Sequence, residues 1–237
     1  MVTAIVLIAG SGSRVGTQIP KQFLLVKGKP LFLYAVNSFE ENPEVDSIVL
    51  VVQPEHAIEV KSICDANHIS KLHLITEGGD SRQESVLKTL KKLKKKLKDD
   101  DIVLIHDGAR PLIDGEIISE NISLAERFGA VETAIASTNT IAISADGEWV
   151  DEVPDRSHLF QVQTPQSFKF DLIYQAHVLA QKKGITHCSD DAQIAIYAGN
   201  KVHIARGNTL NFKITTYEDF SIFKALVELV EGDSNVG

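Results

Sequence analysis

The stretch that decides the fold reads Thr3-Ala-Ile-Val-Leu-Ile-Ala9, Gly10-Ser-Gly12-Ser-Arg14-Val-Gly16 and Pro20-Lys21-Gln22-Phe23. An apolar run of strand length leads directly into a loop with three glycines. Glycine permits positive φ and close approach to a ligand, so successive N–H groups can converge on an anion. The two cations, Arg14 and Lys21, follow where a polyphosphate would lie. The stretch therefore predicts a strand followed by a nucleotide-binding loop.

The loop departs from the two best-known phosphate-binding patterns. A dinucleotide fingerprint requires G-x-G-x-x-G, but Val15 stands where the third glycine belongs. A P-loop requires Gly-Lys-Ser or Gly-Lys-Thr after its glycines, and neither follows here. The alternative is a tight strand-to-helix turn with surface cations. Pro20 favours the binding loop, because proline fixes the chain direction just before Lys21.

Length and charge narrow the class of protein. The 237 residues are 43% hydrophobic and contain no linker-like stretch, so we expect a single domain over residues 1–237. The formal net charge of −8 opposes nucleic-acid binding and favours a small phosphorylated ligand. The apolar run at residues 2–9 is too short for a membrane span or a signal peptide, which indicates a cytoplasmic setting without a membrane partner. Neither Cys64 nor Cys188 has a metal-ligand spacing.

Strand-like and helical patterns alternate along the chain, which predicts an α/β fold. Its sheet is expected to be Rossmann-like and mostly parallel, with helices on both faces. The expected strands are Ala4–Ala9, Ser47–Val52, Leu72–Thr76, Ile102–His106, Val131–Ala136 and Lys201–Ala205, and the expected helical stretches are Pro30–Phe39 and Glu55–Asn67.

Two further segments have a structural interpretation. In the lysine run Lys88–Lys98, the apolar residues Val86, Leu90, Leu93 and Leu97 follow helical spacing, so the lysines cover the solvent face of a helix. Asp146-Gly147 is a hairpin turn signal between the apolar flanks 140–144 and 148–153. A protruding β-hairpin arm over residues 138–160 is therefore expected, and a two-fold partner is the economical surface for it to pack on.

Three segments place acids, cations and glycines at strand ends. Gly79, Asp80 and Ser85 offer donors to a base or ribose, or else form an ordinary turn capped by Ser81 or Ser85. Asp107 follows a buried strand, where it could hold Mg²⁺ directly or through water, with Arg110 facing a phosphate. The alternative is an Asp–Arg pair that closes a loop.

Lys213 lies between Phe212 and Ile214, in what the pattern predicts to be a buried strand. Lysine is rarely buried without an anion to meet, so Lys213 is a candidate site residue. Together with Arg14, Lys21 and Arg156 it would suit a doubly phosphorylated transition state.

The combined motifs resemble those of the cytidylyltransferases that act on polyol phosphates, which have the nucleotide-diphospho-sugar transferase type of fold. They cover residues 4–220 in order: A-G-x-G-x-R-x-G, P-K-Q-F, G-G-D-x-R, H-D-G-A-R-P, P-D-R-S, Q-T-P-Q-x-F and N-x-K-I-T-T. The family has a methylerythritol-phosphate branch, in isoprenoid synthesis, and a ribitol-phosphate branch, in wall-polymer synthesis.

The resemblance implies roles for individual residues. Arg14 and Lys21 would stabilise charge on the α-phosphate as pyrophosphate leaves, with Mg²⁺ as cofactor. Arg156 and Lys213 would position the polyol phosphate, and Thr140 and Arg156 would reach into a neighbouring subunit of a homodimer. The remaining substrate-binding residues would be Ile8, Ala9, Gly10, Ser11, Gly12, Gly79, Asp80, Ser85, Asp107, Gly108, Arg110 and Thr164.

The acceptor is the less determined substrate. Asn139-Thr140 replaces the Asp-Thr usual in the family, which removes an acid near the acceptor site. Motifs such as Ser189-Asp190-Asp191-Ala192 favour methylerythritol 4-phosphate, whereas Phe160-Gln-Val-Gln163 favours ribitol 5-phosphate. Two other classes fit the loop, namely a sugar-1-phosphate nucleotidyltransferase with another base and a non-catalytic nucleotide-binding protein.

Overall fold

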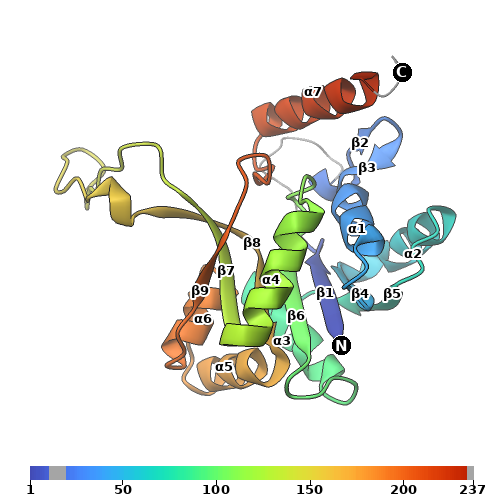
Figure 1. The fold of residues 1–237 in the computed structure, drawn as a ribbon, viewed down its shortest axis with the longest axis horizontal. Coiled ribbons are helices and arrows are strands. Elements are labelled where there is room, and N and C mark those ends of the chain that lie inside the picture. Colours follow the sequence, from blue (N-terminus) through green and yellow to red (C-terminus); the bar gives the residue numbers. More distant parts are fainter. Residues whose placement is uncertain (11–19, 234–237) are drawn as a thin grey trace.

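The computed structural model describes residues 1–10 and 20–233, with side chains to Leu229. Ser11, Gly12, Arg14 and Val15 therefore lie outside the described residues. Within them, a central sheet has the strand order β5-β4-β1-β6-β8-β7-β9 (Figure 1). Its strands are β1 (Val2–Leu7), β4 (Ser47–Val52), β5 (Leu72–Glu77), β6 (Ile102–Asp107), β7 (Ala130–Ala136), β8 (Phe160–Lys169) and β9 (His203–Arg206). A separate two-stranded ribbon pairs β2 (Leu25–Val26) with β3 (Lys29–Pro30).

The sheet is mostly parallel, as predicted. Strand β1 pairs in parallel with β4 and β6, and β4 pairs in parallel with β5. The exception is β8, which the apolar pattern did not predict and which runs antiparallel to both β6 and β7. Its centre carries Gln163, Thr164, Gln166 and Ser167, all buried. These polar side chains hide the strand from a search for apolar runs.

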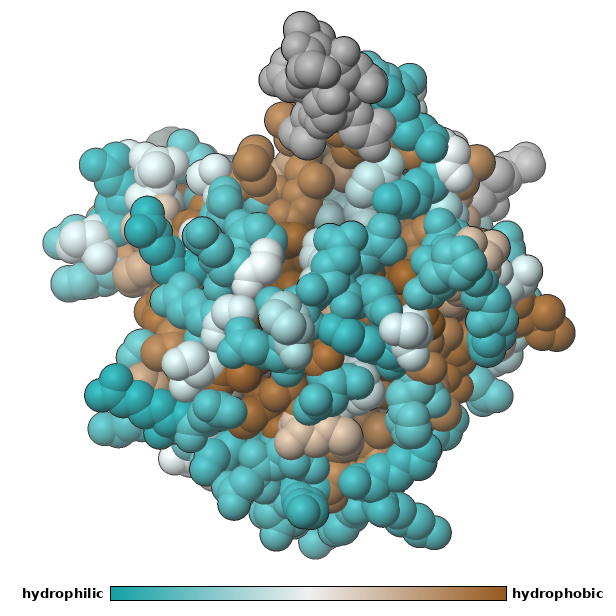
Figure 2. Space-filling view, turned by 45° about the vertical axis from the view of Figure 1, so that its right-hand side comes forward, coloured by the Kyte–Doolittle hydropathy of each residue, from teal (hydrophilic) through white to brown (hydrophobic). Residues whose placement is uncertain are grey.

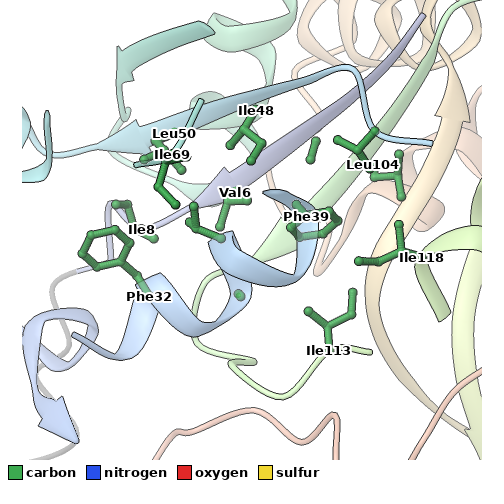
Figure 3. Packing of buried hydrophobic residues seen from close by; sticks show 14 of the residues in the cluster. Val6, Ile8, Phe32, Phe39, Ile48, Leu50, Ile69, Leu104, Ile113 and Ile118 are labelled. Carbon is green, nitrogen blue, oxygen red and sulfur yellow. The ribbon is translucent and has the colours of Figure 1, made fainter. Parts of the chain in front are cut away.

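Helices of the described ranges cover both faces of the sheet. Helices α1 (Leu31–Glu41), α2 (Ala57–Ala66) and α4 (Gly115–Phe128) pack on one face. Helices α3 (Arg82–Leu93), α5 (Phe170–Lys182) and α6 (Asp191–Tyr197) pack on the other. Figure 3 shows the first layer, where Phe32 and Phe39 of α1 face Val6 of β1 and Ile48 of β4. The alternation of buried side chains along β1 divides it between the two layers, as expected of a strand buried on both faces.

The C-terminal helix α7 (Tyr217–Asp233) closes a third, smaller cluster. Its Phe223 packs edge-on against Tyr34 of α1 at a centroid distance of 5.1 Å. Ile214, just before the helix, is fully buried in the same cluster. Short 3₁₀ turns at Lys21–Phe23, Pro54–His56 and Arg156–His158 complete the described elements.

The first part of the lysine run forms helix α3, as its spacing predicted, but the helix ends at Leu93 and residues 94–98 are not helical. Val86, Leu90 and Leu93 are buried in the helix, and Leu97 is buried in the turn that follows. Ser81 is the N-cap residue, because its side chain accepts a hydrogen bond from the Glu84 N–H.

The arm between β7 and β8 protrudes from the body, as the yellow segment of Figure 1 shows. The predicted strands 140–144 and 148–153 are wrong in extent, because an isolated antiparallel bridge, Ile143 to Glu152, is all that forms between them. The Asp146 side chain instead stabilises the turn, because it accepts hydrogen bonds from the N–H groups of Glu148 and Trp149. The Trp149 side chain is 75% exposed, so the arm presents apolar surface to its surroundings.

Polar side chains cover most of the face drawn in Figure 2, with apolar surface visible between them. Among the helices of the described ranges, none is both long and apolar enough to cross a membrane.

Candidate active site

A cavity of about 400 Å³ opens at the carboxyl ends of the central strands. Leu7 at the end of β1 is in register with Val51 of β4 and Asp107 of β6, so the segments after these strands meet at one edge. This is where ligands bind in open α/β sheets. The cavity is lined by Leu7, Ile8, Ala9, Gly10, Lys21, Gln22, Gln53, Gly79, Asp80, Ser81, Arg82, Ser85, Asp107, Ala109 and Lys213.

Two glutamines hold the backbone where the glycine loop begins. Gln22 Nε2 donates to the carbonyls of Ile8 and Gly10, at 2.8 and 2.9 Å. Gln53 Nε2 donates to the carbonyl of Ala9 at 2.6 Å. In a planar trans peptide the next N–H points away from the carbonyl, so these bonds also fix the direction of the Ala9 and Gly10 N–H groups. The sequence analysis quoted Gln22 only as part of a motif and did not identify Gln53.

The segment from Gly78 to Ser85 forms a second wall of the cavity. The Ser85 hydroxyl accepts from the Gly79 N–H and donates to the Ser81 carbonyl, both at 2.8 Å. Ser85 therefore shapes the turn before α3. The Asp80 N–H is held by Glu84 at 2.8 Å, and the Asp80 side chain is exposed.

Asp107 is the most densely paired carboxylate of the site. Its Oδ1 accepts from Arg82 Nε at 3.2 Å and its Oδ2 from Lys213 Nζ at 2.7 Å. Burial alone would raise the pKa of Asp107, but Arg82 and Lys213 outweigh it and hold that pKa far below its usual range. Lys213 thus meets an anion, as expected. The expected strand is absent, because residues 212–215 form irregular backbone.

Polar side chains next to Asp107 hold its backbone in place. The Thr164 hydroxyl accepts from the Asp107 N–H at 3.0 Å and lies 3.1 Å from His106 Nδ1. Burial lowers the pKa of His106 to about 4, so the ring is neutral near pH 7. Arg110 donates to the carbonyls of Asn211 and Val162, at 2.8 and 3.2 Å. Thr164 and Arg110 lie beside the cavity and do not line it.

Gly108 lies where β6 passes closest to the strand that precedes the glycine loop. A Cβ on it would come within 2.4 Å of Ile8 Cγ2 and 3.1 Å of the Leu7 carbonyl. Only glycine therefore lets the chain after Asp107 approach the start of the glycine loop this closely at the edge of the sheet.

Thr140 and Arg156 lie on the arm, both exposed, and do not line the cavity of their own chain. Arg156 Nη1 donates to the Thr138 carbonyl at 3.0 Å. The cavity thus brings together Ile8, Ala9, Gly10, Lys21, Gly79, Asp80, Ser85, Asp107 and Lys213 of the predicted residues.

Arg82 is the charged residue of the site to which the sequence analysis assigned no role. It appeared only inside the G-G-D-x-R motif, because its partners are distant in sequence. Asp107 is 25 residues away and Asp191 is 109 residues away. No local pattern links residues at such separations.

The described part of the chain contains no group of three or more His, Cys, Asp or Glu residues arranged to hold a metal ion. Asp80 and Asp107 are the carboxylates that line the cavity. This donor set does not form a protein cage. It fits a cation that is held mainly by phosphate oxygens and water, with one or two carboxylates, which is the usual mode for Mg²⁺.

Comparison with known proteins gives a consistent result. Residues 2–229 match the IspD family, 2-C-methyl-D-erythritol 4-phosphate cytidylyltransferase. The chain is 43% identical to the protein of that name from Clostridium botulinum (strain Eklund 17B / Type B), over 96% of this chain and 99% of the relative. It is 39% identical to the one from Clostridium acetobutylicum, over 95% and 96% of the two chains.

Solved structures agree with the sequence comparison. The 4-diphosphocytidyl-2C-methyl-D-erythritol synthase from Anaerococcus prevotii superposes with a TM-score of 0.80 at 28% identity, covering 96% of each chain. The 2-C-methyl-D-erythritol 4-phosphate cytidylyltransferase from Thermus thermophilus gives a TM-score of 0.76 at 28% identity, covering 94% of this chain and 98% of that one. The fold, the ordered motifs and these matches together show that the chain belongs to the 2-C-methyl-D-erythritol 4-phosphate cytidylyltransferase family.

Proposed function

We propose that the protein transfers CMP from CTP to 2-C-methyl-D-erythritol 4-phosphate, giving CDP-methylerythritol and pyrophosphate. The observation that carries the proposal is the cavity itself, where Lys21, Arg82 and Lys213 line one space with the start of the glycine loop. Both substrates are anionic, so an enzyme for this reaction needs cations and fixed N–H donors around a single cavity.

The chemistry is an in-line attack of a phosphate monoester oxygen on the α-phosphorus of CTP. A P–O bond forms to the acceptor as the bond to pyrophosphate breaks, and no protein nucleophile is required. Lys21 and Arg14 stabilise the charge that develops on the α-phosphate and the leaving group. Lys213, held by Asp107 at 2.7 Å, orients the acceptor phosphate. Charge neutralisation and alignment supply the rate enhancement.

A divalent cation, Mg²⁺ by its chemistry, completes this site. Asp107 and Asp80, the carboxylates that line the cavity, would hold it together with phosphate oxygens and water. Such an ion withdraws charge from phosphate oxygens and makes pyrophosphate a better leaving group.

The acceptor is methylerythritol 4-phosphate rather than ribitol 5-phosphate. The relatives at 43% and 39% identity both carry the methylerythritol name, over nearly their full lengths. Asn139, in place of the usual Asp, is exposed on the arm beside Thr140.

The protein acts as a homodimer in the cytoplasm. Support for the dimer comes from the arm, on which Ile141, Ile143, Trp149, Val150 and Val153 are all exposed. Exposed apolar side chains gathered on a protruding segment are typical of an interaction surface. In such a dimer, Thr140 and Arg156 complete the cavity of the partner subunit.

The test is pyrophosphate release with CTP and Mg²⁺, comparing methylerythritol 4-phosphate with ribitol 5-phosphate at equal concentration. We expect a large preference for methylerythritol 4-phosphate and for CTP over ATP, GTP and UTP. Faster turnover with ribitol 5-phosphate would show that the protein belongs to the ribitol-phosphate branch. Tight CTP binding without turnover on either acceptor would contradict an enzymatic role.

A further inference from the structure

Arg82, which lines the cavity, also belongs to a cluster of polar side chains whose other members do not line it. Arg82 comes from the start of α3, Asp191 from the start of α6 and Gln166 from β8. We call this set, together with His177 of α5, the rear cluster. It ends on the carboxylate of Asp107, and of its four members only Arg82 lines the cavity.

Arg82 occupies a position that helix electrostatics disfavour. It is the first residue of α3, and a cation at a helix N-terminus opposes the helix dipole. Two carboxylates explain why the guanidinium is there. Its Nε donates to Asp107 Oδ1 at 3.2 Å and its Nη1 donates to Asp191 Oδ2 at 2.6 Å. Arg82 therefore bridges the site to a second acid.

Asp191 has no exposed surface and is held on every polar side. Its Oδ1 accepts from His177 Nε2 at 2.9 Å and its Oδ2 accepts from Arg82. Its backbone N–H donates to Gln166 Oε1 at 2.9 Å. His177 of α5 and Arg82 of α3 hold the carboxylate, and Gln166 of β8 holds the backbone of the same residue, so the body of the protein fixes the position of Asp191. It does not line the cavity.

The Asp107 carboxylate links Arg82, and through it Asp191, to a cation that lines the cavity. One of its oxygens is held by Arg82 and the other by Lys213. A planar carboxylate cannot move one oxygen without moving the other. Any shift of Arg82 therefore turns Asp107 and displaces the ammonium group of Lys213, which lines the cavity.

We propose that Asp191, acting through Arg82, is a positioning residue that sets the orientation of Asp107 and the place of Lys213 in the cavity. The proposal deepens the proposed function, on which its kinetic test rests. Asp191 touches no substrate. Its effect on the reaction is transmitted by two ion pairs across α3.

The first test is Asp191→Asn, which keeps the shape of the side chain and removes the charge that holds Arg82. We expect kcat to fall by about 10- to 100-fold, as misplacement of a reacting group does. The KM for CTP should change less than kcat, because the bonds that hold Gly10 and Gly79 at the cavity do not involve Asp191. Ser167→Ala is the matched control, since Ser167 is equally buried on β8 and bonds Asn121, away from Asp107.

A merely structural role for Asp191 predicts a different pattern. Both variants would then lower the unfolding temperature, and both would keep the wild-type kcat when assayed well below it. A wild-type kcat for folded Asp191→Asn therefore overturns the proposal.

Two further variants test the route through Arg82. Arg82→Lys keeps a cation and should retain more activity than Arg82→Gln, which does not. In the Arg82→Gln background, adding Asp191→Asn should lower kcat by less than about twofold, because the route is already broken. If the effects of the two substitutions on kcat were fully additive, the proposed route through Arg82 would be overturned. If Asp191→Asn fails to fold, Asp191→Glu decides the proposal, because it keeps the charge but displaces the carboxylate that Arg82 meets. A wild-type kcat for this variant would overturn the proposal.

A crystal structure of Asp191→Asn provides a readout that needs no turnover. The proposal expects the Asp107 carboxylate to turn and its contact with Lys213 to lengthen. An unchanged contact overturns it. A wild-type protein that releases no pyrophosphate would instead contradict the proposed function, and the crystal structure would still decide the inference.

Discussion

Lys213 keeps 39% of its side chain exposed while its ammonium group donates to Asp107 at 2.7 Å. Such a cation can reach a phosphate. We expect Lys213→Ala to lower kcat/KM by about 10²- to 10³-fold, the usual effect of removing one charge-stabilising donor. The unfolding temperature should also fall, because the buried Asp107 carboxylate keeps Arg82 but loses its second partner.

Lys224→Ala is the control, because Lys224 is an exposed cation of α7 that pairs with Glu228 at 4.0 Å, away from the cavity. Steady-state pyrophosphate release and thermal unfolding measure the two effects. A Lys213→Ala enzyme with near-normal kcat/KM would remove this residue from the site.

Glu132 on β7 gives a prediction on pH. Burial, and then the charge of Asp190, raise its pKa to about 7, despite a hydrogen bond from Gln166 that lowers it. The folded protein thus holds this proton more tightly than the unfolded chain, whose glutamate pKa lies near 4.3. Stability linked to Glu132 is present below about pH 4 and is lost as the pH rises through about 7.

Glu132→Gln should therefore stabilise the protein at pH 8, by about 1–3 kcal/mol, and much less at pH 5. The glutamine can still accept the bond that Gln166 donates over 2.8 Å. Thermal unfolding at both pH values measures the difference, with Glu126→Gln, an exposed position of α4, as control. Equal effects at the two pH values would contradict the assignment.

At the scale of elements, the contact between β6 and the start of the glycine loop leaves no room for a side chain at Gly108. An added Cβ would meet Ile8 at 2.4 Å. We expect Gly108→Ala to destabilise the fold by about 1–3 kcal/mol and to raise the KM for CTP, because Ile8 lines the cavity.

Gly115→Ala is the matched control, since the nearest atom to its added Cβ is 3.9 Å away. Denaturant unfolding and CTP titration measure the two variants. Equal stability and equal KM for both would show that the loop accommodates the extra atom.

The strand that the sequence located most accurately is one whose burial is uniform. Ser47–Val52 was located to the residue, because every side chain of β4 is buried and the run is apolar apart from Ser47. Strand β8 was missed because Gln166 and Ser167 are buried yet polar, each satisfied by a partner from another element. The bonds that make such residues acceptable in a core are long-range, and a local pattern cannot show them.

The same reason limits what the sequence reveals of the site. The glycine loop, Asp107 and Lys213 are recognisable because each stands at an edge of an apolar segment. Arg82 and Gln53 are not, because their roles depend on contacts with Asp191 and Ala9 across the fold. The resemblance to a family supplied the arm residues Thr140 and Arg156, which geometry within one chain does not bring to the cavity.

At the scale of the whole molecule, the proposed dimer makes a quantitative prediction. Arg156→Ala and Lys213→Ala should each be inactive. Lys213→Ala damages the cavity of its own chain, whereas Arg156→Ala damages the cavity of the partner subunit if Arg156 serves that cavity. After unfolding and refolding together at equal amounts, half of the dimers are mixed, and each mixed dimer has one intact cavity. About a quarter of wild-type activity should return.

The control is a mixture of Lys213→Ala with Asp107→Asn, two residues that line the cavity of their own chain. Each mixed dimer then holds one defect in each cavity, so no activity should return. Sedimentation at micromolar concentration must show a dimer. Equal recovery in the two mixtures, or a monomer, would contradict the shared site.

The cavity is closed by residues that follow the last strand of the central sheet. Lys21 Nζ donates to the Ile214 carbonyl at 2.7 Å, and Lys213 meets Asp107 across a separation of 106 residues. Helix α7, made later still, covers Leu31 at the start of α1. While the ribosome is still making the chain, the nascent protein has a glycine loop but lacks the lysine that would hold an acceptor. Competence to react therefore arrives only after every described strand of the central sheet has been synthesised.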